Sequence, residues 1–138
     1  MKGEVIVLDT NIWISYLLSR KFHILTSNIL EFKLDVVTCV RLKTEITEVL
    51  QRKKFSKYIS KKDVKEALNI HLKLCRFIEV ESKSDYLTDK KDNYLIDLYQ
   101  TSKATILVTG DKQLLEQAPK FGINVITLRQ FENRLSKL

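Results

Sequence analysis

Hydrophobic residues along this chain alternate between short continuous runs and stretches with helical spacing. The segments at 4–8, 34–39, 76–80, 104–108 and 124–127 have the length and apolar character of strands. Between them, apolar residues recur every three or four positions, as in helices that pack one face against a core. Strands that alternate with helices are typical of a parallel sheet covered on both faces. We therefore predict an α/β fold, a three-layer α/β/α sandwich with a central, mainly parallel sheet of four or five strands.

Two of the predicted strands end in polar residues of the same kinds. One apolar run leads directly into Asp9, and a later run leads into Thr109 and Asp111. Ligands of open α/β sheets bind at the carboxyl ends of the strands. Two carboxylates in one crevice repel each other, and both stay ionised only beside a cation. The pattern therefore indicates a divalent-metal site at this edge of the sheet, with Asn11 as a candidate N-cap of the following helix.

Two further acids lie on predicted helices. Glu45 borders the apolar face of a helix predicted over 41–53, and Asp92 opens a helix after a polar loop. Each has another interpretation, because an acid beside an apolar face is commonly solvated and Asp is a frequent N-cap. Glu48 lies close enough to compete with Glu45 for the same role. We expect Asp97, on another face of its helix, to be solvated.

Clustered carboxylates suit metal-assisted hydrolysis of phosphodiesters. Mg²⁺ and Mn²⁺ take oxygen ligands and keep several waters. One ion lowers the pKa of a bound water, and one or two ions stabilise the attacking and leaving oxygens. This chemistry requires no serine or cysteine nucleophile. His23 and His71 have no partner at a metal-ligand spacing, so we expect both to be structural.

The charge of the chain favours a polyanionic partner. The 138 residues carry a formal net charge of +7, which favours nucleic acid or an acidic protein, and their number suggests a single domain over 1–138. A basic segment with interleaved aromatic residues follows the helix of Glu45, and it can equally be a solvated connection. Its candidate RNA-binding residues are Arg52, Lys53, Lys54 and Lys57.

The remaining bulk features predict a cytoplasmic protein with no membrane partner. No apolar run approaches the ~20 residues of a membrane span, and the first strand lacks the flanks of a signal peptide. Cys39 and Cys75 have no metal-ligand spacing and fall within apolar patterns. We expect them to be buried thiols in a reducing compartment.

Four segments, taken in order, resemble the PIN-domain family. They are IVLDTN at 6–11, TEITEVL at 44–50, KDNYLIDL at 91–98 and LVTGDKQLL at 107–115. Any one of them is a weak signal, but four in this order and at these separations are fairly specific. The likeness extends over nearly the whole chain. The chain is most similar to bacterial PIN proteins named as toxins of toxin–antitoxin systems, which are related to the VapC-like ribonucleases.

The resemblance implies an endoribonuclease that depends on one or two Mg²⁺ or Mn²⁺ ions. By position, it assigns four acids to catalysis and metal binding: Asp9, Glu45, Asp92 and Asp111. Asp9 and Asp92 would be direct ligands, and the other two acids would bind directly or through water. Three neighbours would hold the acids by hydrogen bonds: Asn11, Thr109 and Asn93. Family members often form homodimers, and toxin members are held inactive by an antitoxin protein.

Several other functions are compatible with parts of this pattern. A PIN-like module that binds RNA or protein without cutting is one, and an RNA-processing nuclease without an antitoxin is another. A phosphatase with an aspartyl nucleophile is disfavoured, because it typically has a second Asp two residues after the first, where this chain has Asn11. A phosphorylated receiver domain needs paired acids near the N-terminus and a late lysine at a strand end, and neither is evident.

Overall fold

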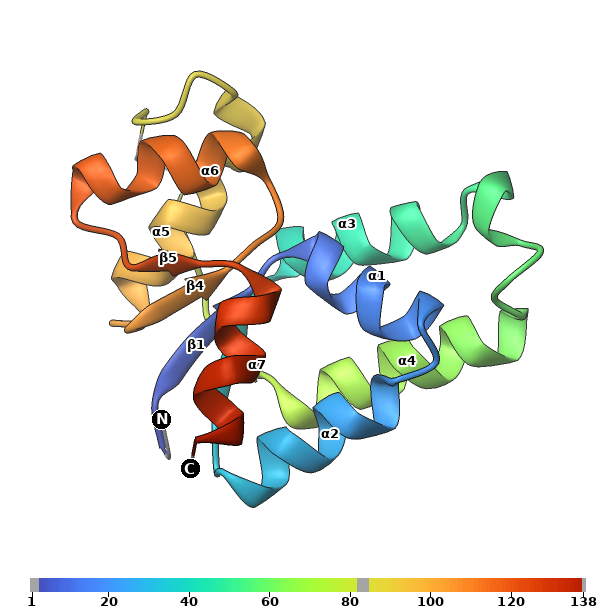
Figure 1. Ribbon diagram of the computed structural model, residues 1–138. Helices are drawn as coiled ribbons and strands as arrows, with labels where there is room; N and C mark the ends of the chain where they lie inside the picture. Colours follow the sequence, from blue (N-terminus) through green and yellow to red (C-terminus); the bar gives the residue numbers. More distant parts are fainter. Residues whose placement is uncertain (1–2, 82–84, 138) are drawn as a thin grey trace.

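The computed structural model describes residues 3–81 and 85–137 of the chain. Its five strands form one parallel sheet in the order β3-β2-β1-β4-β5 (Figure 1). The strands are β1 (Val5–Leu8), β2 (Asp35–Thr38), β3 (Arg76–Phe77), β4 (Ile106–Val108) and β5 (Val125–Ile126). The predicted α/β class and the parallel sheet are therefore confirmed.

The strands are shorter than the segments that predict them. The largest difference is at β3, an edge strand that pairs only with β2. After β3, the Ile78 N–H donates to the Thr38 carbonyl at 2.8 Å, and the ladder ends there. An apolar run thus predicts that a strand exists better than it predicts its length, because pairing also requires a neighbour along the whole run.

Helices connect successive strands and cover the sheet. Those in the described ranges are α1 (Thr10–Leu18), α2 (Phe22–Glu31), α3 (Val40–Leu50), α4 (Lys61–Leu74), α5 (Asn93–Thr101), α6 (Lys112–Gln117) and α7 (Leu128–Ser136), with short 3-10 helices η1 (Lys53–Phe55), η2 (Lys90–Asp92) and η3 (Ala118–Phe121). The first four α-helices pack against one another on one side of the strands, and α5 and α6 lie on the other (Figure 1).

The core centres on β1, the central strand of the sheet, and on its neighbour β4. Ile6, Val7 and Leu8 of β1 are fully buried, as are Leu107 and Val108 of β4. Their continuous apolar sequence is what a strand buried on both faces requires. Because β1 lies between β2 and β4, the chain leaves β1 toward one side of the sheet and later returns on the other. The carboxyl ends of β1 and β4 therefore flank a topological switch point.

Local capping signals fix several helix starts. Ser60 and Asp63 form a capping box at α4, and Thr127 and Gln130 form one at α7. Both boxes satisfy backbone N–H groups that the first helical turn leaves unpaired.

The expectation that Asp97 is solvated is wrong, because its side chain is buried. Every residue from Asn93 to Leu98 is buried in α5. Asp97 lines a cavity with Glu79 and Glu81, which lie in the chain that follows β3. A polar residue on the far side of a helix is exposed only if no other segment crosses it, and helical spacing does not report such a crossing.

Two further expectations concern the thiols and the membrane. Cys39 and Cys75 are both free and buried. Within the described ranges, no helix has the length and apolar character needed to cross a membrane.

Candidate active site

The two acids at strand ends are also the N-caps of the helices that follow. Asp9 lies between β1 and α1, and its Oδ1 accepts a hydrogen bond from the Thr10 N–H at 2.7 Å. Asp111 precedes α6, and its Oδ1 accepts from the N–H groups of Gln113 at 2.8 Å and Leu114 at 3.4 Å. Because β1 pairs directly with β4, the two capping carboxylates lie at the same edge of the sheet.

Asp9 is held from its other side by two residues that the sequence predicts for that task. The Thr109 hydroxyl donates to Asp9 Oδ2 at 2.7 Å, and the Asn11 amide donates to the same oxygen at 3.3 Å. Asn11 Oδ1 accepts from the Gly110 N–H at 3.0 Å, so its side chain ties the two strand ends together. The expectation that Asn11 caps α1 is wrong, because Asp9 has the extended backbone of an N-cap and takes that position.

Glu45 reaches the site from the middle of α3. Its Oε2 accepts hydrogen bonds from the hydroxyls of Thr10, at 2.7 Å, and Tyr94. Glu48 is exposed and does not line the groove described below, so Glu45 is the acid that α3 directs into the site.

Thr10 and Tyr94 are contacts that sequence reasoning did not single out. A signal was present, since Thr10 follows Asp9 directly and Tyr94 lies within the KDNYLIDL segment. Tyr94 is buried, and burial together with the nearby Glu45 carboxylate raises the pKa of its hydroxyl, which keeps it a donor.

Asp92 differs from the other acids in its lack of partners. Asp92 is 8% exposed, and its carboxylate accepts no hydrogen bond from any residue within 3–81 or 85–137. It therefore does not cap α5, the alternative role that its position suggests. Asn93 beside it accepts a hydrogen bond from the Leu87 N–H at 2.9 Å and so holds the preceding loop. The resemblance assigns Asn93 to holding the acids by a hydrogen bond, whereas this hydrogen bond is made to the loop.

Two acids of the site have pKa values well above the ordinary value of an aspartate. Burial raises the pKa of Asp9 to about 6, although hydrogen bonds from Thr109 and Thr10 oppose the shift. Burial also raises the pKa of Asp92 to about 7, and the charges of Asp9 and other acids add to this shift. Near neutral pH the cluster therefore resists full ionisation unless a cation neutralises it.

The acids share one open groove with basic residues. A cavity of about 510 Å³ is lined by all four acids, by the basic side chains of Arg52, Lys54 and Lys91, and by the apolar side chains of Ile14, Val49 and Phe55. Of the four predicted RNA-binding residues, Arg52 and Lys54 line this groove. Lys53 and Lys57 are exposed and do not line it. Positive and negative side chains thus border the same space, from the turn after α3 to the strand ends.

The donor set fits a hard divalent cation. All the candidate ligands are carboxylate oxygens, which Mg²⁺ and Mn²⁺ prefer. Among the described residues, no three side chains of the ligating types already converge on a single ion position. Mg²⁺ does not need such a cage, since it usually binds one or two carboxylates and keeps several waters. The unpartnered Asp92 carboxylate and the raised pKa of Asp9 are the features that a cation would relieve.

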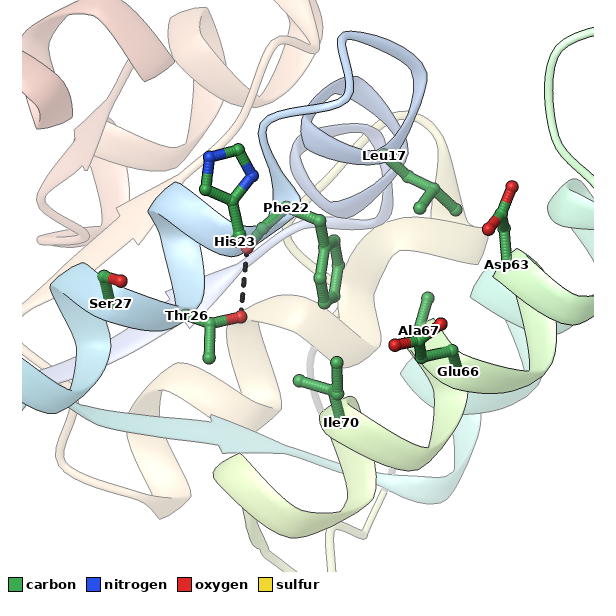
Figure 2. A pocket seen from close by; sticks show the side chains of 9 residues that line it. All are labelled: Leu17, Phe22, His23, Thr26, Ser27, Asp63, Glu66, Ala67 and Ile70. Atoms are coloured by element: carbon green, nitrogen blue, oxygen red, sulfur yellow. Dashed lines mark hydrogen bonds between the residues drawn. The ribbon is translucent and has the colours of Figure 1, made fainter.

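A second cavity of about 410 Å³ lies away from the acid cluster, between α2 and α4. Figure 2 shows its lining of apolar and polar side chains, with the Phe22 ring projecting toward Ala67 and Ile70. The dashed line marks the Thr26 hydroxyl donating to the Phe22 carbonyl at 3.0 Å, a bond within one helix. Asp63 at its rim belongs to the capping box of α4. No member of the acid cluster lines this cavity, so it is not part of the candidate active site.

Comparison with known proteins agrees with this geometry. The family model described as PIN domain matches residues 5–113, most of the chain. The chain belongs to the PIN-domain family. PIN domains are generally nucleases that use divalent metal ions. The matched range contains all four acids of this PIN domain and ends before β5 and α7.

The fold of this PIN domain also occurs in a solved structure. A chain in the crystal structure of VapBC2 from Rickettsia felis, bound to a DNA fragment from their promoter, is similar with a TM-score of 0.61. The match covers 89% of this chain and 98% of that chain at 14% sequence identity, and at that identity it shows the fold alone. Comparison with curated proteins gave no match.

Proposed function

We propose that this PIN domain is a Mg²⁺- or Mn²⁺-dependent endoribonuclease that hydrolyses phosphodiester bonds of RNA. The observation that carries the proposal is the groove itself, where four acids and three basic side chains border one space. An acidic pocket alone would repel a polyanion, whereas basic side chains beside it attract the phosphates. Membership of a family of nucleases supports the same reaction class.

The residues have distinct roles in this proposal. Asp9 and Asp92 hold the ion, and Glu45 and Asp111 bind it directly or through water. Thr109 and Asn11 keep the Asp9 carboxylate in one orientation through their hydrogen bonds. A bound cation supplies a water of lowered pKa and stabilises charge on the phosphate oxygens.

The basic side chains of the groove position the substrate. Arg52, Lys54 and Lys91 contact phosphates on either side of the cut, because these long cations border the acids of the groove. The Lys91 ammonium pairs with the Asp89 carboxylate at 3.7 Å, and that acid does not line the groove. Phe55 lies among them and offers a ring on which a base stacks. Both contacts are largely independent of sequence, so the groove alone does not select one RNA.

The cleavage test compares purified wild-type protein with matched variants on a mixed structured RNA. We expect cleavage with Mn²⁺, none with EDTA, and a loss of about 100-fold or more in Asp9→Asn. Lys54→Ala is expected to raise KM several-fold, whereas Lys120→Ala, which removes the same charge outside the groove, leaves KM within about twofold. RNA that binds but is never cut by wild type would favour the non-cleaving module instead.

We further propose that the protein is the toxin of a toxin–antitoxin pair, whose antitoxin partner blocks the groove. The similar fold in VapBC2 motivates this proposal, and a homodimer is part of the same expectation. Expression of wild type should arrest bacterial growth, while Asp9→Asn should not. Rescue by a small acidic protein encoded beside the gene would support the pair. Cleavage of RNA in vitro without growth arrest would favour an RNA-processing nuclease.

A further inference from the structure

A smaller cavity, of about 250 Å³, is lined by Tyr94, which also contacts the acid Glu45. The Tyr94 hydroxyl donates to Glu45, which lines the acid groove, while the Tyr94 ring lines the smaller cavity. The Arg41 guanidinium lies over this ring, with its central carbon 5.3 Å from the ring centroid. The buried Tyr94 side chain thus connects the smaller cavity to Glu45 of the acid groove. The Arg41 side chain over its ring is exposed to solvent.

Helix α3 carries a charged residue of each cavity on the same face, Arg41 in the smaller cavity and Glu45 in the acid groove. Arg41, Glu45 and Val49 are spaced by four and therefore share one face of the helix. Arg41 and Glu45 are about 6 Å apart along the axis, from a rise of ~1.5 Å per residue. Arg52, just beyond the end of α3, lines the acid groove. A strand of nucleic acid along this face meets an arginine on each side of Glu45.

The lining of the smaller cavity suits a base better than a phosphate alone. Val40, Ile78 and Val80 give it apolar walls, and Val40 is 72% exposed although it is a large apolar residue. A nucleobase has apolar faces that such walls cover and a polar edge that needs hydrogen bonds. Glu79 at the rim repels phosphates but accepts hydrogen bonds from amino groups, as acidic side chains do from the cytosine N4 amine.

We propose that this cavity binds the base of a nucleotide next to the scissile phosphate of the RNA. We name it the flanking-nucleotide site, and it is lined by Cys39, Val40, Arg41, Ile78, Glu79, Val80 and Tyr94. Arg41 contacts the phosphate or an acceptor on the base, and Glu79 accepts from an exocyclic amino group. Adenine, cytosine and guanine carry such a group and uracil does not, so the site discriminates against uracil. The proposal rests on RNA being the substrate, as proposed above.

The first experiment sequences the ends produced from a randomised single-stranded RNA library with Mn²⁺. Wild type is expected to disfavour uridine at one position beside the cut, and Glu79→Ala to lose that bias. Arg41→Ala is expected to raise KM about tenfold with little change in kcat. Arg129→Ala removes an exposed arginine of α7, outside both cavities, and should change KM by less than about twofold. An unchanged KM in Arg41→Ala, with the uridine bias kept in Glu79→Ala, overturns the proposal.

A second experiment separates this site from the nuclease activity. Fluorescent short RNAs that differ at one base are titrated into Asp9→Asn protein, which binds without cutting. Adding Arg41→Ala should weaken binding about tenfold, and adding Arg129→Ala should not. If wild type never cleaves RNA but this difference appears, the nucleotide site stands and the proposed nuclease fails. If RNA is cleaved but the two arginine variants bind equally, the nuclease stands and the nucleotide site fails. No binding by Asp9→Asn protein with Arg41 intact also overturns the site.

Discussion

Two clusters of polar side chains lie at the carboxyl ends of neighbouring strands, and they differ in charge. At the end of β2, the Thr38 hydroxyl is 3.0 Å from His71 Nε2, and both side chains are buried. The His71 ring meets the Trp13 ring edge-on at 4.6 Å. Burial lowers the pKa of His71 to about 4, so this cluster is neutral at pH 7. At the ends of β1 and β4, four acids share one groove. Burial there, with the charges of neighbouring acids, raises the pKa of Asp9 and Asp92.

The difference separates a structural role from a ligand-binding one. The Thr38–His71 pair satisfies its own hydrogen bonds and packs against an aromatic ring, as buried polar groups of a core usually do. The acid cluster lacks such internal satisfaction. Its negative charges repel one another, and the Asp92 carboxylate has no hydrogen-bond partner among the described residues. The first cluster therefore contributes to folding, and the second costs stability until a cation binds.

The largest effect on this comparison is expected from Asp9→Asn. The amide can still accept from the Thr10 N–H and keep the N-cap of α1. The substitution removes one negative charge from the proposed ion site, so the rate of RNA cleavage should fall about 100-fold or more. Initial rates with saturating Mn²⁺ measure the loss, with urea unfolding as the control for the fold. A variant that keeps wild-type rates would show that Asp9 is only a helix cap.

For His71→Ala we expect the reverse, a loss of stability with little change in the cleavage rate. This change opens a cavity and leaves the Thr38 hydroxyl without its buried partner, so the free energy of unfolding should fall by about 3 kcal/mol. Cleavage per folded molecule should stay within about twofold, because His71 does not line the acid groove. Urea unfolding and initial rates test the two parts. Intact stability with a large loss of rate would reverse the assignment of the two clusters.

The two clusters should also respond to pH in opposite directions when no metal is present. Asp9 and Asp92 have raised pKa values, so they stabilise the fold below about pH 4 and lose that stability as pH rises toward 7. His71 has a lowered pKa, so its contribution falls as pH drops from 6.5 toward 4. Each group changes the free energy of unfolding by at most about 1.4 kcal/mol per pH unit.

Variants separate these overlapping contributions. In urea unfolding with EDTA between pH 4 and 8, His71→Gln should steepen the fall of stability with rising pH, and Asp92→Asn should flatten it. Mn²⁺ should reduce the fall in wild type, because it favours the ionised acids. A pH profile that Asp92→Asn leaves unchanged would contradict the raised pKa of Asp92.

A smaller effect is expected for Asp92→Asn at pH 7. Removing a charge from a repelling cluster should leave the metal-free protein as stable as wild type, or more stable by about 1 kcal/mol. The same variant should lose most of the stabilisation by Mn²⁺. Thermal melts with EDTA and with Mn²⁺ measure both. A clear drop in metal-free stability would instead assign Asp92 to capping α5, a role worth ~1 kcal/mol.

The smallest effect is expected for Tyr94→Phe. The change removes one of the two hydroxyls that hold Glu45 Oε2, while Thr10 remains. We expect a fall in kcat of about threefold to tenfold with little change in KM, in line with one hydrogen bond of about 1 kcal/mol. Thr10→Val is the matched variant, and the double variant should lose more than either alone. Unchanged kcat in the double variant would mean that the orientation of Glu45 does not matter.

The sequence predicts the strand ends of this site more securely than its helical contributors. Asp9 and Asp111 follow apolar runs directly, so their position at the edge of the sheet depends only on strand recognition and on parallel pairing. Glu45 and Glu48 look alike along the chain. Only the packing of α3 against α1, which places Thr10 beside Glu45, decides between them.

Other features depend on contacts between distant segments. Tyr94 reaches Glu45 across 49 positions, and Asn11 reaches Gly110 across 99. The sequence predicts neither partner, since hydrogen-bonding side chains have no periodic pattern comparable to that of apolar residues. Asp97 illustrates the same limit, because it is buried beside a cavity that it shares with the chain following β3.

The central claim is that Asp9, Glu45, Asp92 and Asp111 form one divalent-cation site. A thermal melt of metal-free protein at pH 7.5 with increasing Mn²⁺ tests it most directly, with Asp9→Asn in parallel and NaCl matched for ionic strength. Wild type should gain about 5 to 10 °C at 100 times Kd, which corresponds to ~2.7 kcal/mol, and Asp9→Asn should gain little. An equal gain in both proteins, or none in wild type, would contradict the account.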